Sequence, residues 1–266
     1  MPMLLIIVLV IVVLWVGLRV RPASFPAYGQ LTPVLKTVPL PDDLPAPVAR
    51  FFKASIGEHV PVIETAVITG RGKLRFMGLT FQSRWRFTHR AGHDYRHYIE
   101  TTIFGMPLFK VNERFVDGKS RMELPFGMVG EGPKTDTAAN LGLWSEGVWL
   151  PSIFVTDPRV RWEGIDETTA RLIVPFGTGE DYFTVQFDAE SGLVRQLETM
   201  RWRDEKNAEK IRWTNQILGW KVFHGVKVPS PAAVIWGDQG FAWFVPEVEE
   251  IAYNVEVADY LLAKGL

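Results

Sequence analysis

The sequence contains no cysteine among its 266 residues. This absence excludes disulfide bonds, thiolate metal sites and a cysteine nucleophile. A surplus of charge is also lacking, because 29 Lys and Arg residues balance 30 Asp and Glu residues and leave a formal net charge of −1. A protein that binds nucleic acid usually carries a basic surplus. We therefore expect no nucleic-acid partner, and no motif in the sequence indicates a cofactor.

The first eighteen residues lack charged side chains, and nearly all of them are aliphatic. Sixteen to eighteen residues of helix span roughly 24–27 Å, at the short end for a bilayer core. Trp15 suits a membrane interface, and Arg19 and Arg21 can reach the lipid head groups. The alternatives are a signal peptide, whose basic start and cleavage site are missing, and a helix buried in a core. The sequence therefore predicts a transmembrane anchor over residues 1–20, a single-pass membrane protein, and contact with the bilayer through Met1–Leu18.

A proline-rich segment follows the apolar run. Seven prolines lie between Pro22 and Pro47, and they indicate an extended spacer over residues 21–43. We expect one β-rich globular domain over residues 44–266, because neither an internal repeat nor a second linker interrupts the rest of the chain. A short helix opens that domain and ends near Gly57.

From Val62 onward, apolar and polar side chains alternate as they do in β-strands. Phe81, Trp85 and Phe87 share one face of such a strand, and the arginines between them share the other. Glycine-containing turns such as Asp117-Gly118 join successive strands as in hairpins, so we predict an antiparallel sheet. The expected strands cover residues 62–76, 79–89, 94–104, 108–116, 119–125, 160–164, 168–175, 181–188, 193–203, 209–221, 226–236 and 241–255.

Two further segments have helical patterns. Lys134–Val148 places Leu141 and Trp144 at helical spacing, with Pro151 just beyond its end. A last short helix is expected over Ala258–Lys264. The predicted fold class is therefore mainly β with a few helices, after one N-terminal transmembrane helix.

His89, His93 and His97 have the spacing of zinc ligands on one face of a helix. Their surroundings alternate as strands do, and Gly92 lies at a turn between them. We interpret the three histidines as residues of a β-hairpin and predict no metal site.

Two glycine-containing segments come close to catalytic motifs. Gly127–Thr135 resembles a phosphate-binding loop, but Pro133 displaces the lysine and removes an amide that would contact phosphate. Gly142–Gly147 resembles a nucleophile elbow, but one residue too many lies before Ser145, which belongs to the predicted helix. Neither segment supports a nucleotide site or a serine hydrolase.

Tryptophan is unusually abundant, with ten residues of which nine follow the apolar run. Four of them follow an arginine, and in a strand the two neighbours face opposite sides, so these pairs do not indicate nucleic-acid binding. The tryptophans either fill a large core or line a groove for an acyl chain or another apolar ligand. The sequence leaves both readings open.

Several short motifs, in a fixed order, are similar to those of a bacterial family of unknown function whose members are mostly membrane-anchored. Phe51 stands where the family usually has tyrosine. The layout more distantly resembles the periplasmic lipoprotein-carrier superfamily, which implies a half-open barrel of curved antiparallel sheet with covering helices around an apolar cavity. It also implies an extracytoplasmic domain, whereas Arg19 and Arg21 favour a cytoplasmic one; we expect the extracytoplasmic side. The motifs are Leu44–Phe51, Trp144–Pro151, Phe187-Asp188, Arg201–Asp204, Gly225–Pro229, Trp236 and Ile251–Asn254.

Three hypotheses about function follow. The first is a membrane-tethered, non-catalytic protein that binds a lipid or another apolar ligand in the curved sheet. The second is a structural or interaction module of an envelope complex, with a filled core and no ligand. The third is a hydrolase built on Glu146 and a histidine, which requires a convergent polar cluster in a cavity. For the first hypothesis, the expected cavity-lining residues are Trp144, Glu146, Trp149, Trp85, Trp202 and Trp236.

Overall fold

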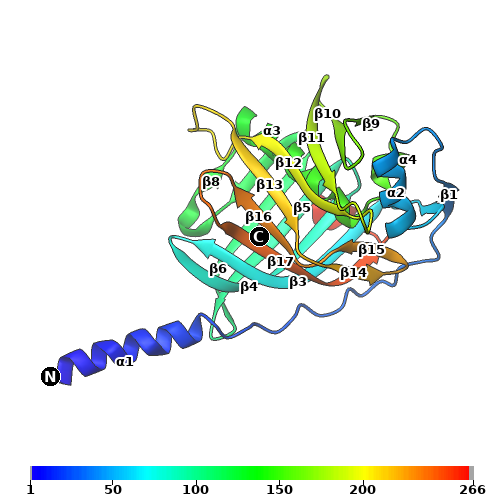
Figure 1. The fold of residues 1–266 in the computed structure, drawn as a ribbon. Helices are drawn as coiled ribbons and strands as arrows, with labels where there is room; N and C mark the ends of the chain where they lie inside the picture. The colour runs from blue at the N-terminus through cyan, green and yellow to red at the C-terminus, as the bar shows by residue number, and fades with distance from the viewer. Residues whose placement is uncertain (1, 264–266) are drawn as a thin grey trace.

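One antiparallel sheet of thirteen strands forms most of the structure, a computed structural model that describes residues 2–263 (Figure 1). Within that range the two end strands do not pair with each other, so the sheet is not closed into a barrel. The prediction of a mainly β fold with few helices is confirmed. In order across the sheet the strands are β8 (Val129–Gly130), β7 (Lys119–Glu123), β6 (Met106–Val116), β5 (Asp94–Ile103), β4 (Leu79–Arg90), β3 (Thr65–Phe76), β17 (Ala242–Tyr253), β16 (Ala232–Trp236), β13 (Ile211–Ile217), β12 (Val194–Arg201), β11 (Gly179–Phe187), β10 (Thr169–Phe176) and β9 (Arg161–Gly164).

Hairpin connections generate most of this order, and one long-range pairing joins its two halves. Strand β3, near the start of the domain, pairs with β17 near its end. Two further two-stranded sheets lie outside the large one. They are β1 (Thr37–Pro39) with β2 (His59–Pro61), and β14 (Trp220–Phe223) with β15 (Val226–Pro229).

A single helix contacts both halves of the sheet. Helix α3 (Pro133–Ser145) packs against β6 and β7 on one side and against β10 and β12 on the other. Strands so far apart in the sheet reach one helix because the sheet curves around it (Figure 1). The other domain helices are α2 (Ala46–Ser55), α4 (Ile153–Thr156) and α5 (Ala258–Leu262). The predicted end of the last helix, Lys264, lies outside the described residues.

The alternation read from the sequence matches the burial of β4. Phe81, Trp85 and Phe87 are buried on the face toward α3 and its following turn, while the arginines between them are partly exposed. Trp85 is fully buried. Its ring stacks on that of Trp149, which follows α3 in the chain, with 5.5 Å between the ring centroids. This contact packs the centre of the sheet against the segment that follows α3.

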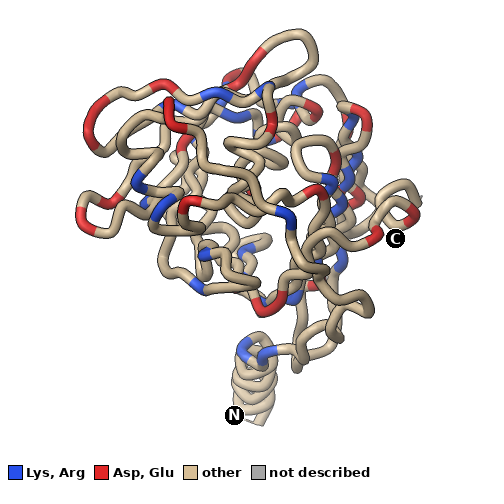
Figure 2. Tube along the Cα trace, turned by 90° about the vertical axis from the view of Figure 1, so that its right-hand side faces the viewer, with Lys and Arg blue, Asp and Glu red and all other residues tan. Residues whose placement is uncertain are grey.

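The prediction of a transmembrane anchor over residues 1–20, and of a single-pass membrane protein, was wrong. Helix α1 covers Pro2–Gly17, and its sixteen residues extend about 24 Å, less than the roughly 30 Å of a bilayer core. Among residues 2–263, no helix is both long enough and apolar enough to cross a membrane. Figure 2 shows that α1 carries no charged residue and that the first basic positions follow it directly. The expected bilayer contact through Met1–Leu18 is not tested by the structure. The expected extracytoplasmic side of the domain came from the family resemblance and is not tested by it either.

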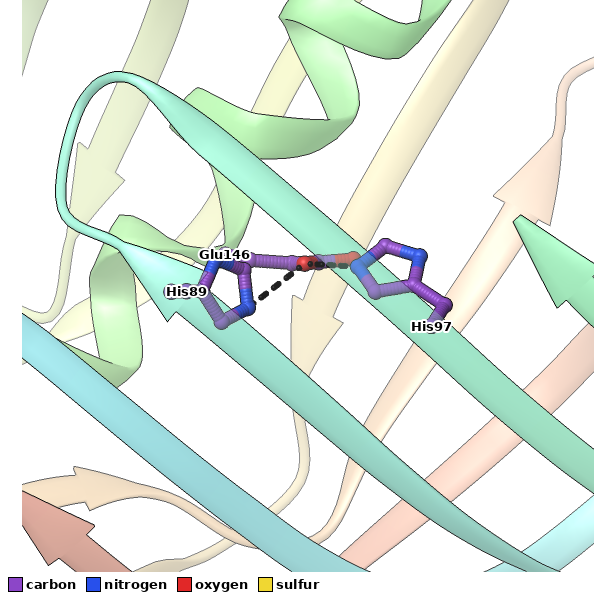
Figure 3. Close-up of side chains that lie close together, drawn as sticks. All are labelled: His89, His97 and Glu146. Atoms are coloured by element: carbon purple, nitrogen blue, oxygen red, sulfur yellow. Dashed lines mark hydrogen bonds and ion pairs between the residues drawn. The ribbon is translucent and has the colours of Figure 1, made fainter. Parts of the chain in front are cut away.

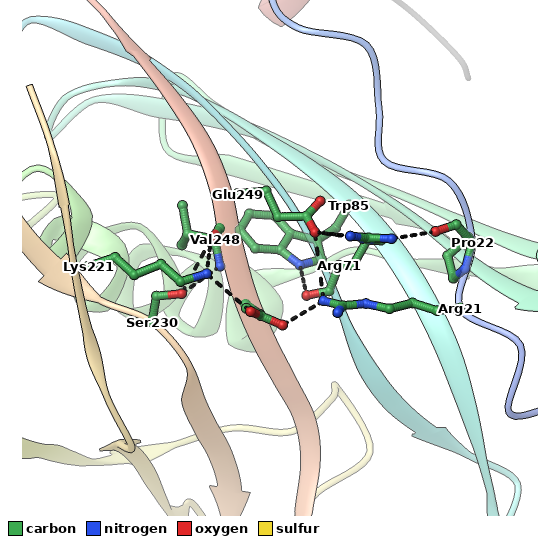
Figure 4. Close-up of polar contacts among 9 residues, drawn as sticks. Arg21, Pro22, Arg71, Trp85, Lys221, Ser230, Val248 and Glu249 are labelled. Carbon is green, nitrogen blue, oxygen red and sulfur yellow. Dashed lines mark hydrogen bonds and ion pairs between the residues drawn. The ribbon is translucent and has the colours of Figure 1, made fainter.

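The segment after α1 is held against the sheet by charged side chains (Figure 4). Arg21 forms a salt bridge of 2.6 Å with Glu247 on β17. Arg71 on β3 donates to the carbonyl of Pro22 at 2.9 Å and pairs with Glu249 at 2.5 Å. Residues predicted as a spacer therefore lie along β3 and β17. The division of the chain at residue 43 into spacer and domain stays a prediction.

The close approach of β3 and β17 depends on a glycine. A side chain on Gly70 would place its Cβ 2.1 Å from the carbonyl oxygen of Glu247 and 2.6 Å from the ring of Trp85. We expect Gly70→Ala to lower the free energy of unfolding by about 1–3 kcal/mol, because the added methyl group overpacks the core. Urea denaturation measures this change. Gly29→Ala is the control, since no atom lies within 4 Å of its Cβ position; equal stability of the two variants would contradict the packing argument.

Candidate functional site

A cavity of about 240 Å³ lies between the concave side of the sheet and the segment that follows α3. Strands from both halves of the sheet line it, so it exists only in the folded chain. Most of its wall is apolar, formed chiefly by Phe87, Ile99, Val148, Trp149, Trp213, Trp236, Trp243 and Phe244. A smaller polar group faces it, chiefly Tyr95, His97, Glu113, Glu146, Arg201, Arg203 and Asn215.

Glu146 enters this site because α3 ends earlier than predicted. The sequence predicts helix through Val148, whereas α3 ends at Ser145 and a 3₁₀ turn, η2 (Glu146–Trp149), follows. Trp149 fixes that turn: its indole Nε1 donates to the carbonyl of Pro229 at 3.0 Å, and its own carbonyl accepts from the hydroxyl of Tyr253 at 2.7 Å. The carboxylate at the start of the turn is thereby held over the sheet.

Two histidines of the β4–β5 hairpin meet this carboxylate (Figure 3). His97 Nε2 lies 2.7 Å from Glu146 Oε2, and His89 Nε2 lies 3.2 Å from the same oxygen. In the register of the hairpin, His97 pairs with Phe87, two positions from His89. Side chains two positions apart share a face of a sheet, so both rings point to the same side.

A second group of side chains holds His97. Its ring lies between Tyr95 and Phe87, each at 3.9 Å between centroids. Its Nδ1 faces Glu113 Oε2 at 3.7 Å, and Glu113 Oε1 accepts a hydrogen bond from the hydroxyl of Tyr95. His97 therefore has one carboxylate near each ring nitrogen.

The electrostatics of this cluster favour an ion pair. Burial lowers the pKa of His97, but Glu146 and Glu113 outweigh it and raise that pKa to about 9. Burial raises the pKa of Glu146, but the charge of His97 and the contacts with both histidines lower it to about 2. Burial dominates at His89 and lowers its pKa. At neutral pH a protonated His97 thus lies between two ionised carboxylates, beside a neutral His89.

Beside Arg203, which pairs with Asp238, Arg201 is a further cation of the cavity. Its Nε donates to the carbonyl of Ala138 at 2.9 Å, and its guanidinium lies over the rings of Trp213 and Trp236 at 4.4 and 5.5 Å. Within residues 2–263, no carboxylate oxygen lies within 4 Å of this guanidinium. The charges of Glu113 and Glu146 nevertheless act on Arg201, and the charge of Arg201 in turn lowers the pKa of Glu113. A cation in an aromatic wall with no carboxylate in direct contact is a point at which an anionic group of a ligand can bind.

Buried polar atoms without partners lie around the same cavity. Among the described residues, Trp213 Nε1, Trp243 Nε1, Arg203 Nε and Asn215 Oδ1 make no hydrogen bond in the structure. Such atoms are rare in folded proteins because each one costs free energy. Three of the four are donors, and all four are buried within the wall of the cavity. Two carboxylates, those of Glu113 and Glu146, line the same cavity.

The structure brings together only some of the residues expected in the site. Glu146, Trp149 and Trp236 line the cavity. Trp85 lies beneath Trp149 in the core, Trp144 is buried in the core away from the cavity, and Trp202 lies near the surface under Lys134. Their role in ligand binding stays a prediction.

Sequence reasoning missed Tyr95 and Glu113. It weighed His97 as a zinc ligand and interpreted it as a hairpin residue, and it considered Arg201 as a strand residue. Glu113 pairs with His97 across β5 and β6. The alternation of polar and apolar residues puts Glu113 on one face of its strand, but only the strand pairing places it opposite a histidine. The turns between the strands were the only sequence feature from which the pairing of Glu113 with His97 could have been predicted.

Residues 34–245 match the model of a family described as a family of unknown function (DUF6544). No curated protein matches the sequence at a significant level. A LolA superfamily protein from Nitrosomonas europaea is 8% identical, with 82% of this chain and 96% of that chain covered and a TM-score of 0.49. A putative outer membrane lipoprotein-sorting protein domain from Vibrio parahaemolyticus is 11% identical, with 80% and 92% covered and a TM-score of 0.41. A DUF1329 family protein from Desulfovibrio piger is 12% identical, with 75% and 90% covered and a TM-score of 0.43. Similarity at this level carries no argument about function.

The position of Trp144 predicts a structural effect of its removal. Its side chain is 1% exposed, and it packs against Gly92 of the β4–β5 turn. We expect Trp144→Ala to lower the free energy of unfolding by about 3–5 kcal/mol, as large aromatic truncations in cores do. Urea denaturation tests this.

Trp202→Ala is the matched control for this substitution. Its ring is only partly buried, and we expect a loss of about 1 kcal/mol or less from the lost contact with Lys134. Equal losses in the two variants would show that the core does not depend on Trp144.

Proposed function

Because the chain belongs to the family of unknown function DUF6544, we propose its function from the site itself: it binds a small ligand with an apolar body and a carboxylate head group, without catalysis. The observation that carries this proposal is the guanidinium of Arg201, which faces an aromatic cavity without an ion-pair partner among the described residues.

The walls of the cavity supply the apolar part. Aromatic rings from η2 and from three strands surround the space, among them Trp149, Trp213, Trp236 and Phe244. Burial of apolar ligand surface against such walls contributes about 25 cal/mol per Å². A volume of about 240 Å³ is at the small end for ligand sites, which favours a medium-length acyl chain over a whole phospholipid.

The donors of the cavity supply the polar part. Arg201, Arg203, Trp213 and Trp243 line the same space, and each of these side chains carries N–H groups. A carboxylate has acceptor sites only and satisfies several donors at once. A planar guanidinium can also hold a carboxylate through two parallel hydrogen bonds. The guanidinium of Arg201 in this wall therefore supports an anionic head group rather than a wholly apolar ligand.

The two alternatives receive less support. A structural module without a ligand predicts a filled interior, whereas a cavity is present. A hydrolase requires a convergent polar cluster, which Glu146 and His97 supply, and it also requires an activated nucleophile. Ser145 lines the cavity, but its hydroxyl donates to the carbonyl of Gly142 at 2.9 Å. Within the described chain no serine hydroxyl makes a hydrogen bond to a histidine ring.

Removal of the cation tests the proposal. We expect wild-type protein to bind decanoate, with a change in tryptophan fluorescence, and to bind 1-decanol less tightly. Arg201→Met should weaken decanoate binding about 10- to 100-fold, because a hydrogen bond to a charged group contributes about 1.5–3 kcal/mol. Binding of 1-decanol should change little. Calorimetric titration with both compounds measures the two affinities.

Arg171→Met is the matched control, since Arg171 lies on β10 outside the cavity and contacts the ring of Tyr182. It should leave both affinities unchanged. Absence of decanoate binding by the wild-type protein, or equal binding by wild-type and Arg201→Met protein, would contradict the proposal. Thermal melting of each variant separates a loss of binding from a loss of folding.

A further inference from the structure

A second feature of the site is independent of the ligand proposed above. We propose that His89, His97 and Glu146 bind a divalent transition-metal ion, with Zn²⁺ as the ion of best fit. Each residue contributes one donor atom, and the three donors lie within 4.8 Å of one another (Figure 3). Two imidazoles and one carboxylate form a ligand set used for zinc, and their chemistry suits this ion better than Mg²⁺ or Ca²⁺.

The spacing of the donors is close to that of a coordination shell. With metal–ligand bonds of about 2.0–2.2 Å, the donors of a tetrahedral site lie about 3.3 Å apart. Glu146 Oε2 lies 2.7 Å from His97 Nε2 and 3.2 Å from His89 Nε2. The pair of Glu146 and His97 would have to move apart to reach this spacing, and the third pair, His89 and His97, lies within 4.8 Å. Side-chain adjustments would therefore admit an ion between the three donors.

The state of His89 points to a missing partner. Its side chain is 1% exposed, and among the described residues its Nε2 makes no hydrogen bond of acceptable geometry, although it faces Glu146. A simple ion pair between Glu146 and His97 leaves this buried nitrogen without a function. A metal ion bound to the same carboxylate would accept the lone pair of His89 Nε2.

The surroundings of His97 match those of a metal ligand. A ligating histidine typically has its other ring nitrogen oriented by a carboxylate. Glu113 occupies that place, at 3.7 Å from Nδ1, and Tyr95 donates a hydrogen bond to Glu113. Packing of the His97 ring between Tyr95 and Phe87 fixes its orientation.

The fourth position of such a site faces the cavity. His97 and Glu146 line the cavity, whereas His89 lies behind them. An ion held by three protein ligands would thus take water or a group of a bound molecule as its fourth ligand. Binding of the ion requires neither Arg201 nor the small carboxylate-bearing molecule proposed above. The two proposals can therefore fail separately.

The experiment uses the full chain, purified and dialysed against EDTA. Equilibrium dialysis with ZnCl₂ and elemental analysis should give one Zn²⁺ per chain. Binding of Co²⁺ should give the intense visible absorption of a four- or five-coordinate ion, which octahedral ions on surface residues do not show. Wild-type protein that remains folded and takes up no Zn²⁺ would overturn the proposal and leave an ion pair at this place.

Substitutions assign the ion to the cluster. Glu146→Gln and His89→Gln should weaken Zn²⁺ binding at least 100-fold, and Glu113→Gln should weaken it about 10- to 100-fold, as changes behind a metal ligand do. His93→Gln is the matched control, because His93 lies exposed in the turn of the same hairpin; it should bind Zn²⁺ as the wild type does.

Folding of each variant is checked by circular dichroism. Undiminished Zn²⁺ binding in Glu146→Gln and His89→Gln would place the ion elsewhere and overturn the proposal. If both variants fail to fold, the Co²⁺ spectrum of the wild-type protein decides: weak octahedral bands would overturn the proposal, and intense bands that His93→Gln retains would support it.

Discussion

The contact between Glu146 and His97 is the interaction on which the geometry of the site depends. It joins the turn after α3 to the middle of the sheet, because Glu146 opens η2 and His97 lies on β5. Taking two charges out of water is expensive, so such a pair persists only where hydrogen bonds and further charges compensate for burial. Glu113 and His89 provide that setting, and the resulting cluster fixes the polar side of an otherwise aromatic cavity.

The core holds this contact in place. Trp149 belongs to the same turn as Glu146, stacks on Trp85 of β4, and is bonded to Pro229 and Tyr253. The turn therefore cannot move without disturbing packing at the centre of the sheet. Trp85, one of the tryptophans that suggested a ligand site from the sequence, lies beneath the cavity wall in this way.

The proposed zinc ion and the proposed anionic ligand have opposite charges, so the binding of one would favour the binding of the other. Without an ion, the protonated His97 and Arg201 balance the carboxylates of Glu113 and Glu146. Zinc binding requires a neutral imidazole, so His97 would release its proton and the dication would take its place. The cavity would then carry one more positive charge than before. This surplus would attract an anionic head group, with Arg201 and the ion on the same side of the apolar space.

The sequence by itself determined the kind of structure. Alternation in Phe81–Thr88, turns such as Asp117-Gly118 and the short helices were sufficient for a mainly β fold of antiparallel strands, because side-chain periodicity is a local property of the chain. Of the six residues expected to line a cavity, Glu146, Trp149 and Trp236 do so; a role of theirs in ligand binding stays a prediction. The apolar run at the start was misjudged, because its hydropathy is high although its helix is only sixteen residues long.

Tertiary structure decided what those residues do. The hairpin interpretation of His89 and His97 placed them in the strands that the structure describes, and it predicted no metal site. Strand register put both on one face, and the early end of α3 brought Glu146 to them from about fifty residues away in the chain. Glu113 and Arg201 joined them through pairings across the sheet. Register and curvature depend on contacts between distant segments, which local periodicity does not encode.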